Sequence, residues 1–370
     1  MSIVPSRMVV DLFAGAGGLS RGFELAGFNV VQALESDARA ADTFRANHPL
    51  TNLVEARVQD LDPEDCAKRI GLKPGELYAM IGGPPCQGFS ESNRRTRSIS
   101  NPNNHLYLQF IRFAGCLRPN WVVIENVAGL RTLAGGAILH GILSGLAEAG
   151  YKAEWRELNA AHFGVPQTRR RLFIIGNRIG HDIPWMTPTH GPQSLPVLTV
   201  RDAIGDLPAI ENGARLDVVP YSTPTPLTLY QSLMREGGQG SALVTGNLVT
   251  RNAPFVVERY RFIPAGGNWQ DIPPRLLNNY KDATRCHTGI YHRLSWDSPA
   301  KVIGNFRKNM LIHPEQHRGL SVREAARLQS FADNYTFAGL LESQQQQVAD
   351  AVPPFLAAAV ARAILHTSLK

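Results

Sequence analysis

The stretch MVVDLFAGAGG, residues 8–18, decides how the rest of the chain is interpreted. Its apolar part predicts a buried strand over Met8–Phe13, and the glycines after it predict a tight turn into a helix over Gly18–Leu25. Glycine lets a backbone approach a ligand closely, and the first turn of a helix offers free N–H groups. Ser20 stands where the GxGxxG dinucleotide fingerprint needs its third glycine. Alone, the turn therefore indicates either an ordinary tight turn or a site for a nucleoside-containing ligand.

Short apolar runs alternate with amphipathic stretches through the first half of the chain. Strand–helix alternation of this kind predicts an α/β fold, an open and mostly parallel sheet with helices on both faces. Ligands of such sheets bind at the carboxyl ends of the strands, where the strand order reverses. Beyond the first strand and helix, we expect strands at Val30–Leu34, Tyr78–Ile81, Trp121–Ile124, Lys152–Leu158 and Arg171–Ile175, the last two paired, and helices at Ala38–Asn47, Leu106–Cys116 and Gly141–Ala149.

The composition changes in the second half of the chain. From Pro188 to about Ile312 it is rich in Pro, Gly, Thr and Asn with few convincing helices, which predicts a smaller domain that is irregular or strand-rich. Helical periodicity returns at Val322–Leu328 and Phe355–Leu365, and the run Gln344–Gln347 is typical of an exposed helix.

The overall composition restricts the class of protein. Of the 370 residues 44% are hydrophobic and 19% charged, as expected for a chain that folds around a core. Lys and Arg exceed Asp and Glu by 38 to 31, and this net charge of +7 favours a polyanionic partner. Because we find no run of ~18 uncharged apolar residues and no signal-peptide pattern at the amino terminus, we expect a cytoplasmic protein. Four cysteines without a CxxC pair predict neither a disulfide framework nor a metal site.

The segment GGPPCQGFS, residues 82–90, follows an expected strand. Its two prolines stiffen the chain before Cys86 and remove backbone donors. A cysteine at the carboxyl end of a strand, beside a ligand-binding turn, is placed to act as a nucleophile. A buried, inert thiol is the usual alternative; it suits Cys66 and Cys116, which fall in expected helices, and Cys286 has no setting like that of Cys86.

Three acidic residues follow other expected strands. Glu35 ends the second strand, about 20 residues beyond the first, where an acid commonly binds ribose hydroxyls. Asp60 could accept a hydrogen bond from an adenine amino group, or it could be a solvated or helix-capping acid. Glu125 closes the strand Trp121–Ile124 and would face the same crevice as Cys86, unless it is an ion-paired or capping acid.

The run QTRRR, residues 167–171, precedes the last expected strand. Alternate residues of an extended chain share a face, so Arg169 and Arg171 would point together and Arg170 away. A solvated basic edge is the alternative for such a run, and it suits Arg170.

These blocks, in this order, resemble the DNA (cytosine-5)-methyltransferase family of bacterial restriction-modification type. The resemblance spans nearly the whole chain, from Asp11 to about Pro354. Its further blocks are HRLSWDSPA at 292–300, SVREAARLQSF at 321–331 and AVPP at 351–354.

The resemblance implies a two-domain enzyme. A Rossmann-like sheet, of the S-adenosylmethionine-dependent methyltransferase class, would occupy residues 1–190, completed by 321–370, and a target-recognition domain would occupy 191–320. The implied partner is double-stranded DNA. We expect the enzyme to act as a monomer, and a cognate restriction endonuclease could accompany it.

The resemblance also implies a chemical mechanism. The Cys86 thiolate would add to carbon 6 of a cytosine flipped out of the duplex, and carbon 5 would then take the methyl group of the cofactor, S-adenosylmethionine. Glu125 would hold the protonated ring nitrogen 3. Arg169 and Arg171 would orient the base carbonyl and stabilise developing negative charge.

Binding residues are implied on several blocks. The DNA-contacting loop would be Gly88–Asn104, although any single arginine in it could be merely exposed. In the second domain arginines alternate with aromatic residues, among which Tyr260 and Phe262 are expected in the core. The implied cofactor residues are Phe13, Ala14, Gly15, Gly17, Gly18, Glu35, Asp60, Pro84, Asp350 and Ala351, and the implied DNA-binding residues are Gln87, Ser90, Arg94, Arg95, Arg97, Arg251 and Arg285.

The chain departs from the family pattern in two blocks. The closing block reads Ala349-Asp350-Ala351-Val352-Pro353 where Gly-Asn-Ala-Val-Pro is usual, and Val302-Ile303-Gly304 replaces the common Thr-Ile-Thr. A negative charge on Asp350 would alter cofactor affinity or selectivity, or the change is neutral.

Three other functions remain open on the sequence alone. Methylation of RNA would use the same Cys86 chemistry, although the long second domain favours duplex DNA. A non-catalytic DNA-binding protein on the same frame is disfavoured because Cys86, Glu125 and Arg171 are all present. A nicotinamide-dependent oxidoreductase is weakened by the missing third glycine.

Overall fold

The chain forms two compact units. The computed structural model describes residues 7–85, 105–236, 242–278, 289–308 and 310–367. Unit 1 comprises Met1–Phe163, Arg170–Pro188 and Val352–Lys370, and unit 2 comprises Gly164–Arg169 and Thr189–Ala351. Residues 321–351, which the sequence led us to place in the first domain, therefore belong to unit 2, together with the short segment Gly164–Arg169.

Unit 1 is built on a seven-stranded sheet with the order β3-β2-β1-β4-β5-β7-β6. The first five strands pair in parallel, and β7 runs antiparallel to both β5 and β6. This confirms the α/β fold. Asn52–Glu55 was not predicted as a strand. The strands are β1 Met8–Leu12, β2 Asn29–Glu35, β3 Asn52–Glu55, β4 Ala79–Gly82, β5 Trp121–Val127, β6 Lys152–Asn159 and β7 Arg170–Asn177.

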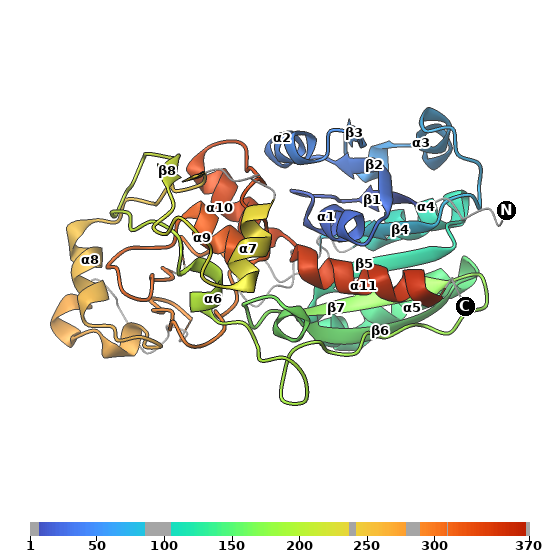
Figure 1. Ribbon diagram of the computed structural model, residues 1–370. Helices are drawn as coiled ribbons and strands as arrows, with labels where there is room; N and C mark the ends of the chain where they lie inside the picture. The colour runs from blue at the N-terminus through green and yellow to red at the C-terminus, as the bar shows by residue number, and fades with distance from the viewer. Residues whose placement is uncertain (1–6, 86–104, 237–241, 279–288, 309, 368–370) are drawn as a thin grey trace. The chain divides into compact units, whose positions relative to one another are not determined.

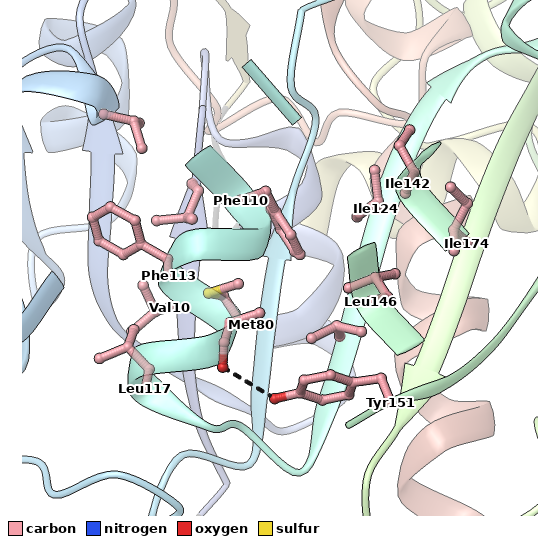
Figure 2. Packing of buried hydrophobic residues seen from close by; sticks show 14 of the residues in the cluster. Val10, Met80, Phe110, Phe113, Leu117, Ile124, Ile142, Leu146, Tyr151 and Ile174 are labelled. Carbon is pink, nitrogen blue, oxygen red and sulfur yellow. Dashed lines mark hydrogen bonds between the residues drawn. The ribbon is translucent and has the colours of Figure 1, made fainter. Parts of the chain in front are cut away.

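Helices cover both faces of this sheet (Figure 1). On one face, α4 and α5 pack against apolar side chains of the strands, and Figure 2 shows Phe110, Phe113, Ile142 and Leu146 beside Val10, Met80, Ile124 and Ile174. The hydroxyl of Tyr151 donates to the Ala114 carbonyl at 3.4 Å beneath this cluster. The helices of unit 1 are α1 Gly18–Leu25, α2 Ala38–Asn47, α3 Pro63–Arg69, α4 Leu106–Leu117, α5 Ala137–Glu148 and α11 Pro354–Thr367, with shorter 3-10 turns at Val58–Asp60, Ala128–Gly136 and Ala160–Phe163.

The carboxyl-terminal helix α11 packs tightly on α1. A Cβ at Gly22 would lie 2.3 Å from the Ala357 Cβ and 2.6 Å from the Pro354 carbonyl oxygen, so only glycine permits this approach. The Tyr78 hydroxyl, at the start of β4, donates to the Ile364 carbonyl of α11. The last helix is therefore an integral layer of unit 1.

Two stretches are long and apolar enough to span a membrane by length and composition alone, Ala128–Glu148 and Leu341–Thr367. Neither is one continuous helix. The first has non-helical backbone at Leu133, Ala134 and Gly135. The second breaks at Ala351, whose ψ of 146° is extended, before α11 begins.

Unit 2 is irregular, with short helices. Its described part contains only two two-residue strands, so the strand-rich alternative was wrong and the irregular one is confirmed. Its elements are α6 Val200–Ile204, β8 Val219–Pro220, α7 Leu229–Glu236, β9 Leu243–Val244, α8 Pro254–Arg261, 3-10 turns at Trp269–Asp271 and Pro274–Leu276, α9 Val322–Leu328 and α10 Leu341–Asp350.

Arginines occupy the interior of unit 2. Arg169, Arg318, Arg323 and Arg327 are among the largest fully buried side chains of the described chain. The glutamine run lies on α10 as expected but is not wholly exposed, because Gln345 and Gln347 are buried and bond to Thr250 and the Ala338 carbonyl. Tyr260 lies in the core as expected, whereas Phe262 is at the surface.

Candidate active site

Two turns meet at the point where the strand order of the sheet reverses. β1 and β4 are neighbours in parallel register, yet the chain proceeds to opposite sides of the sheet from them. A Cβ at Gly82, the last residue of β4, would lie 2.3 Å from the Leu12 carbonyl oxygen at the end of β1. The two strand ends therefore lie too close for a side chain between them, which brings together the turn after Leu12 and the segment Gly83–Pro85. Crevices at such points are the usual ligand sites of α/β sheets.

Glu35, at the end of β2, holds the turn after β1. Its Oε2 accepts from the Gly15 N–H at 2.7 Å, while its Oε1 accepts from the N–H groups of Ser36 and Asp37, each at 2.7 Å. The turn is strained, since Phe13 has a φ of +63° that non-glycine residues rarely adopt. Gly15 has a φ of +55°, and a Cβ placed there would have no atom within 4 Å, so open space lies beside it. The ring of Phe13, the carboxylate of Glu35 and this space suit a nucleoside-containing cofactor.

A buried carboxyl group lies beneath this turn. Asp11 of β1 is fully buried, and its Oδ2 accepts from the Ser20 hydroxyl of α1 at 2.6 Å. Its Oδ1 has no hydrogen-bond partner in the described part of the chain. Burial, aided by the charge of Glu35 and opposed by the Ser20 hydrogen bond, raises the pKa of Asp11 to about 8. Asp11 is therefore largely protonated at neutral pH.

An ion pair lies at the end of the next strands of the sheet. Nε of Arg171 on β7 forms an ion pair with Oε1 of Glu125 on β5, at 2.8 Å. The register pairs Val127 with Arg171 and Glu125 with Phe173, so the two charged residues are diagonal neighbours on one face of the antiparallel pair. The side chains of Arg171 and Glu125 are only 14% and 11% exposed, which leaves a small accessible surface on an otherwise dry pair. Such a pair can offer both an acceptor and several donors to one polar ring.

Two residues with no predicted role complete this end of the sheet. Asn126 donates from Nδ2 to the Pro84 carbonyl at 3.0 Å and thereby fixes the segment that leads to Cys86. A Cβ at Gly83 would lie 3.2 Å from Oε2 of Glu125, so a larger residue there would press on the carboxylate. The sequence signal for Asn126 was its position next to Glu125, at the end of a strand that meets β4.

Comparisons with known proteins agree with this geometry. The profile of the C-5 cytosine-specific DNA methylases matches residues 7–366. The chain belongs to this family. It is 35% identical to the Type II methyltransferase M1.HphI of Haemophilus parahaemolyticus, covering 97% of this chain and 87% of that protein. It is 33% identical to the Type II methyltransferase M.AgeI of Thalassovita gelatinovora, covering 96% and 98%. A crystal structure of a candidate DNA modification methyltransferase from an E. coli prophage superposes with a TM-score of 0.79 at 25% identity, covering 98% of this chain and 99% of that one.

The two arginines expected to act together in this methylase have different surroundings. Arg169 belongs to unit 2 and has no exposed surface; its guanidinium donates to the carbonyls of Ile303, Ala349 and Ala351 at 2.9–3.1 Å. These bonds support the backbone of unit 2 around Arg169, the residue that the resemblance expected to orient the base carbonyl together with Arg171. Arg170 is exposed and pairs with Glu157, as expected of a basic edge.

Three of the methylase's expected cofactor residues have surroundings that do not by themselves point to a ligand. Asp60 is half exposed and pairs with Arg57, three residues before it. Asp350 is exposed at the end of α10 and accepts from Gln346 Nε2 at 2.8 Å on both oxygens. Ala351 contributes its carbonyl to Arg169 within unit 2.

Several expected site residues fall outside the described chain, together with the expected loop Gly88–Asn104. They are Cys86, Gln87, Ser90, Arg94, Arg95, Arg97 and Arg285, and the same holds for Cys286.

The two cysteines expected in helices are found there. Cys66 lies in α3 and Cys116 in α4, and burial raises the pKa of each thiol, which disfavours the reactive thiolate. Among the residues that the structure describes, no group of three or more His, Cys, Asp or Glu side chains could hold a metal ion.

Proposed function

We propose that Cys86 is the nucleophile of this DNA methylase and that Glu125 and Arg171 bind the target cytosine. Cys86 directly follows Pro85, and the Pro84 carbonyl is held by Asn126, the neighbour of Glu125 in β5. The chain therefore enters Cys86 from a point that is tied to the strand carrying Glu125. This juxtaposition is the observation that carries the proposal.

Each residue has a distinct part in the reaction. The Cys86 thiolate forms a bond to carbon 6 of cytosine, and the electron pair of the 5,6 double bond moves to carbon 5. A proton held between Glu125 and ring nitrogen 3 offsets the charge that this addition develops. The remaining N–H groups of Arg171 donate to the base carbonyl in a site shielded from water, where such bonds are strongest. With this electron pair, carbon 5 would take the methyl group that the cofactor supplies. A base then removes the carbon-5 proton, and the electron pair of that C–H bond re-forms the 5,6 double bond as the Cys86 sulfur leaves, which releases the methylated ring.

The proposed cofactor is S-adenosylmethionine, which supplies the methyl group as a sulfonium. Glu35 would accept from its ribose hydroxyls, and the backbone of the turn Phe13–Gly18 would surround it. The ring of Phe13 offers an apolar face for an adenine base. Asp60, Pro84, Asp350 and Ala351 remain predicted contacts that rest on the resemblance; the contact of Asp350 would be made by its main chain, since its carboxylate bonds Gln346.

The proposed substrate is a specific duplex sequence read mainly by unit 2. The cytosine must be flipped out, at a cost of a few kcal/mol, before carbon 6 can meet the thiolate. The resemblance assigns Gln87, Ser90, Arg94, Arg95, Arg97, Arg251 and Arg285 to DNA contacts. Because the similar bacterial proteins are named Type II methyltransferases, we assign this chain to a restriction-modification or related defence system, acting as a monomer beside a cognate endonuclease.

Covalent trapping tests the proposal. Duplex DNA with 5-fluorocytosine at the target blocks proton loss from carbon 5, so the wild-type protein with S-adenosylmethionine should form an adduct that survives denaturation. Cys86→Ser should form none, and Cys66→Ser, at a buried helical thiol, should form it as the wild type does. A serine variant at position 86 that still methylates DNA at an undiminished rate would overturn the proposal. Parallel reactions with radiolabelled cofactor and RNA instead of DNA test the alternative substrate.

A further inference from the structure

Unit 2 contains a recess with a mixed polar and apolar lining that the chemistry above does not use. Its volume is about 420 Å³, and it opens between the start of α8 and the two segments around residues 212 and 252. The lining side chains that matter here are Asn212, Arg251, Asn252, Val257, Glu258 and Arg261. They supply donors, one carboxylate and an apolar surface, which is the mixture that base edges require.

The two segments that carry the recess are tied together by hydrogen bonds. The Val249 N–H donates to the Ala214 carbonyl at 3.1 Å. Asn212 bonds the backbone of Asn252 twice, donating from Nδ2 to its carbonyl at 2.9 Å and accepting from its N–H on Oδ1 at 3.0 Å. Since Val249 is fully buried, this pairing is anchored in the core of unit 2. A binding group gains precision when its support is rigid.

A buried ion pair supports the same wall from behind. Arg318 is 1% exposed and donates from Nε to the Ile210 carbonyl at 2.9 Å, just before the recess segment. Both its terminal nitrogens bond Glu324 of α9, at 2.8 and 2.6 Å. The charge network of the core thus fixes the position of residues 210–214.

Arg251 packs on this supported segment, and its guanidinium is available to bind a ligand. A Cβ at Gly213 would lie 2.8 Å from both Cβ and Cγ of Arg251, so the stem of the arginine packs directly on the glycine backbone. The side chain is exposed and makes no hydrogen bond or ion pair with any residue that the structure describes. By contrast, Arg259 one turn into α8 is buried and donates to Leu276 and Tyr291. The sequence alone could not distinguish the two.

Glu258 supplies the complementary group. It is half-buried, and its Oε2 lies 3.4 Å from Arg261 Nη1, which orients the carboxylate on the surface of α8. An unpartnered guanidinium and a carboxylate in one recess match the two halves of a G·C pair, because arginine binds guanine O6 and N7 while a carboxylate accepts from the cytosine amino group. Val257 and the stems of the arginines would cover the base-pair edge between them.

We propose that this recess reads one G·C pair of the recognition sequence, with Arg251 on the guanine and Glu258 on the cytosine. The proposal deepens the function above and rests on it, since it assumes that unit 2 recognises duplex DNA. It separates Arg251 from the exposed arginines that would contact only phosphates. Phosphate contacts strengthen binding to every sequence alike, whereas a base contact changes the ranking of sequences.

Methylation of a sequence library distinguishes these roles. The wild-type enzyme is incubated with duplexes in which each base pair of its site is varied, and bisulfite sequencing gives the rate for each duplex. Arg251→Ala should reduce discrimination at one G·C pair by about 10- to 100-fold and leave the other positions unchanged. Glu258→Ala should relax the same position. Arg215→Ala, which removes an exposed positive charge next to the recess segment but outside its lining, should lower all rates together and weaken their salt dependence.

The outcomes separate the two proposals. If the wild type methylates no duplex, the proposed function fails and the recess proposal fails with it. If the wild type has a defined site but Arg251→Ala keeps its full discrimination, only the recess proposal is overturned. The same holds if Arg251→Ala and Glu258→Ala relax different positions, or if the site contains no G·C pair that either variant affects. Gly213→Ala, which displaces the Arg251 stem without removing its charge, should reproduce the loss of discrimination.

Discussion

Arg171 of unit 1 and the buried Arg293 and Arg323 of unit 2 bind different kinds of partner. In unit 1, Arg171 lies at the end of a regular sheet and pairs with Glu125, another side chain. In unit 2, Arg293 is buried and donates to the carbonyls of Tyr260, Ile263 and His313, and Arg323 to those of Thr245, Ala332 and Tyr335. A sheet satisfies its own backbone groups, so its side chains remain available for chemistry. An irregular chain leaves carbonyls without partners, and buried arginines meet that need.

This contrast explains why two neighbouring arginines of one motif have separate roles. Arg171 follows the start of β7, where the ladder with β5 and β6 is complete. Arg169 is two residues earlier, in the segment of unit 2, and there it bonds three carbonyls. The difference in local backbone regularity therefore accounts for the different partners of Arg169 and Arg171.

The largest expected effect is on the stability of unit 2. Arg327 is fully buried between Asp206 and Asp333, with nitrogen–oxygen distances of 2.5 and 2.6 Å. Arg327→Met leaves both carboxylates buried without this cation, which costs about 3–5 kcal/mol of unfolding free energy. Urea unfolding measures the loss. Arg170→Met, at an exposed pair, is the control and should change stability by less than about 1 kcal/mol. Equal losses for the two variants would show that the buried Arg327 stabilises the chain no more than an exposed arginine does.

The next effect is on catalysis and should leave stability nearly intact. Glu125→Gln keeps the shape of the side chain but removes the charge that holds a proton on the base, so we expect kcat to fall by about 10²–10³-fold. Arg171→Lys should lose a similar factor because a lysine cannot reproduce the fork of donors. Single-turnover rates with saturating DNA and cofactor give the measurement. Arg170→Lys, on the adjacent residue, should keep the wild-type rate. If Glu125→Gln lowered the thermal midpoint as much as Arg327→Met does, the main role of Glu125 would be to stabilise the fold.

A smaller effect concerns the pH dependence of unit 1. The pKa of Asp11 is raised from 3.8 to about 8, so the folded chain keeps a proton that the unfolded chain releases above pH 4. Stability should therefore decline as pH rises between these values and level off above pH 8. Asp11→Asn has no such proton to lose. The unfolding free energies of Asp11→Asn and the wild type are measured from about pH 5 to pH 8. As the pH rises, the variant should become more stable relative to the wild type. A difference that stays constant with pH would show that Asp11 is ionised in the folded state.

Much of the fold of unit 1, but little of the fold of unit 2, could be predicted from the sequence. Helices with clear caps and periodicity, such as Ala38–Asn47 after Asp37, were placed at their observed bounds. The edge strand Asn52–Glu55 was missed because it is short and half polar. In unit 2, nothing in the periodicity shows that Gln345 and Gln347 face inward, because buried polar residues depend on partners distant in sequence.

Dependence on partners distant in sequence also limited the prediction of the site residues. The sequence identified Glu35, Glu125 and Arg171 as residues at strand ends. The structure places Glu35 at the end of β2 and Arg171 near the start of β7, whereas β5 continues past Glu125 to Val127. Asn126 and Gly83 received no predicted role because their roles depend on contacts to a different strand. The recess around Arg251 could not be foreseen, since it depends on the pairing of segments 40 residues apart.

The smallest effect is expected at the departures from the family pattern. Unit 2 holds both departing blocks through main-chain atoms, because Gln167 and Arg169 bond the N–H and carbonyl of Ile303 and the carbonyls of Ala349 and Ala351. Such contacts do not depend on side-chain identity, which permits substitution at these positions. Asp350 itself bonds back to Gln346 and places a negative charge at the carboxyl end of α10, where the helix dipole disfavours it. Asp350→Asn should therefore raise the thermal midpoint slightly, by the equivalent of about 0.3–1 kcal/mol, and leave the affinity for S-adenosylmethionine within about twofold of the wild type. Isothermal titration measures that affinity. A change in affinity of more than about twofold would show that the Asp350 charge acts directly on the bound cofactor.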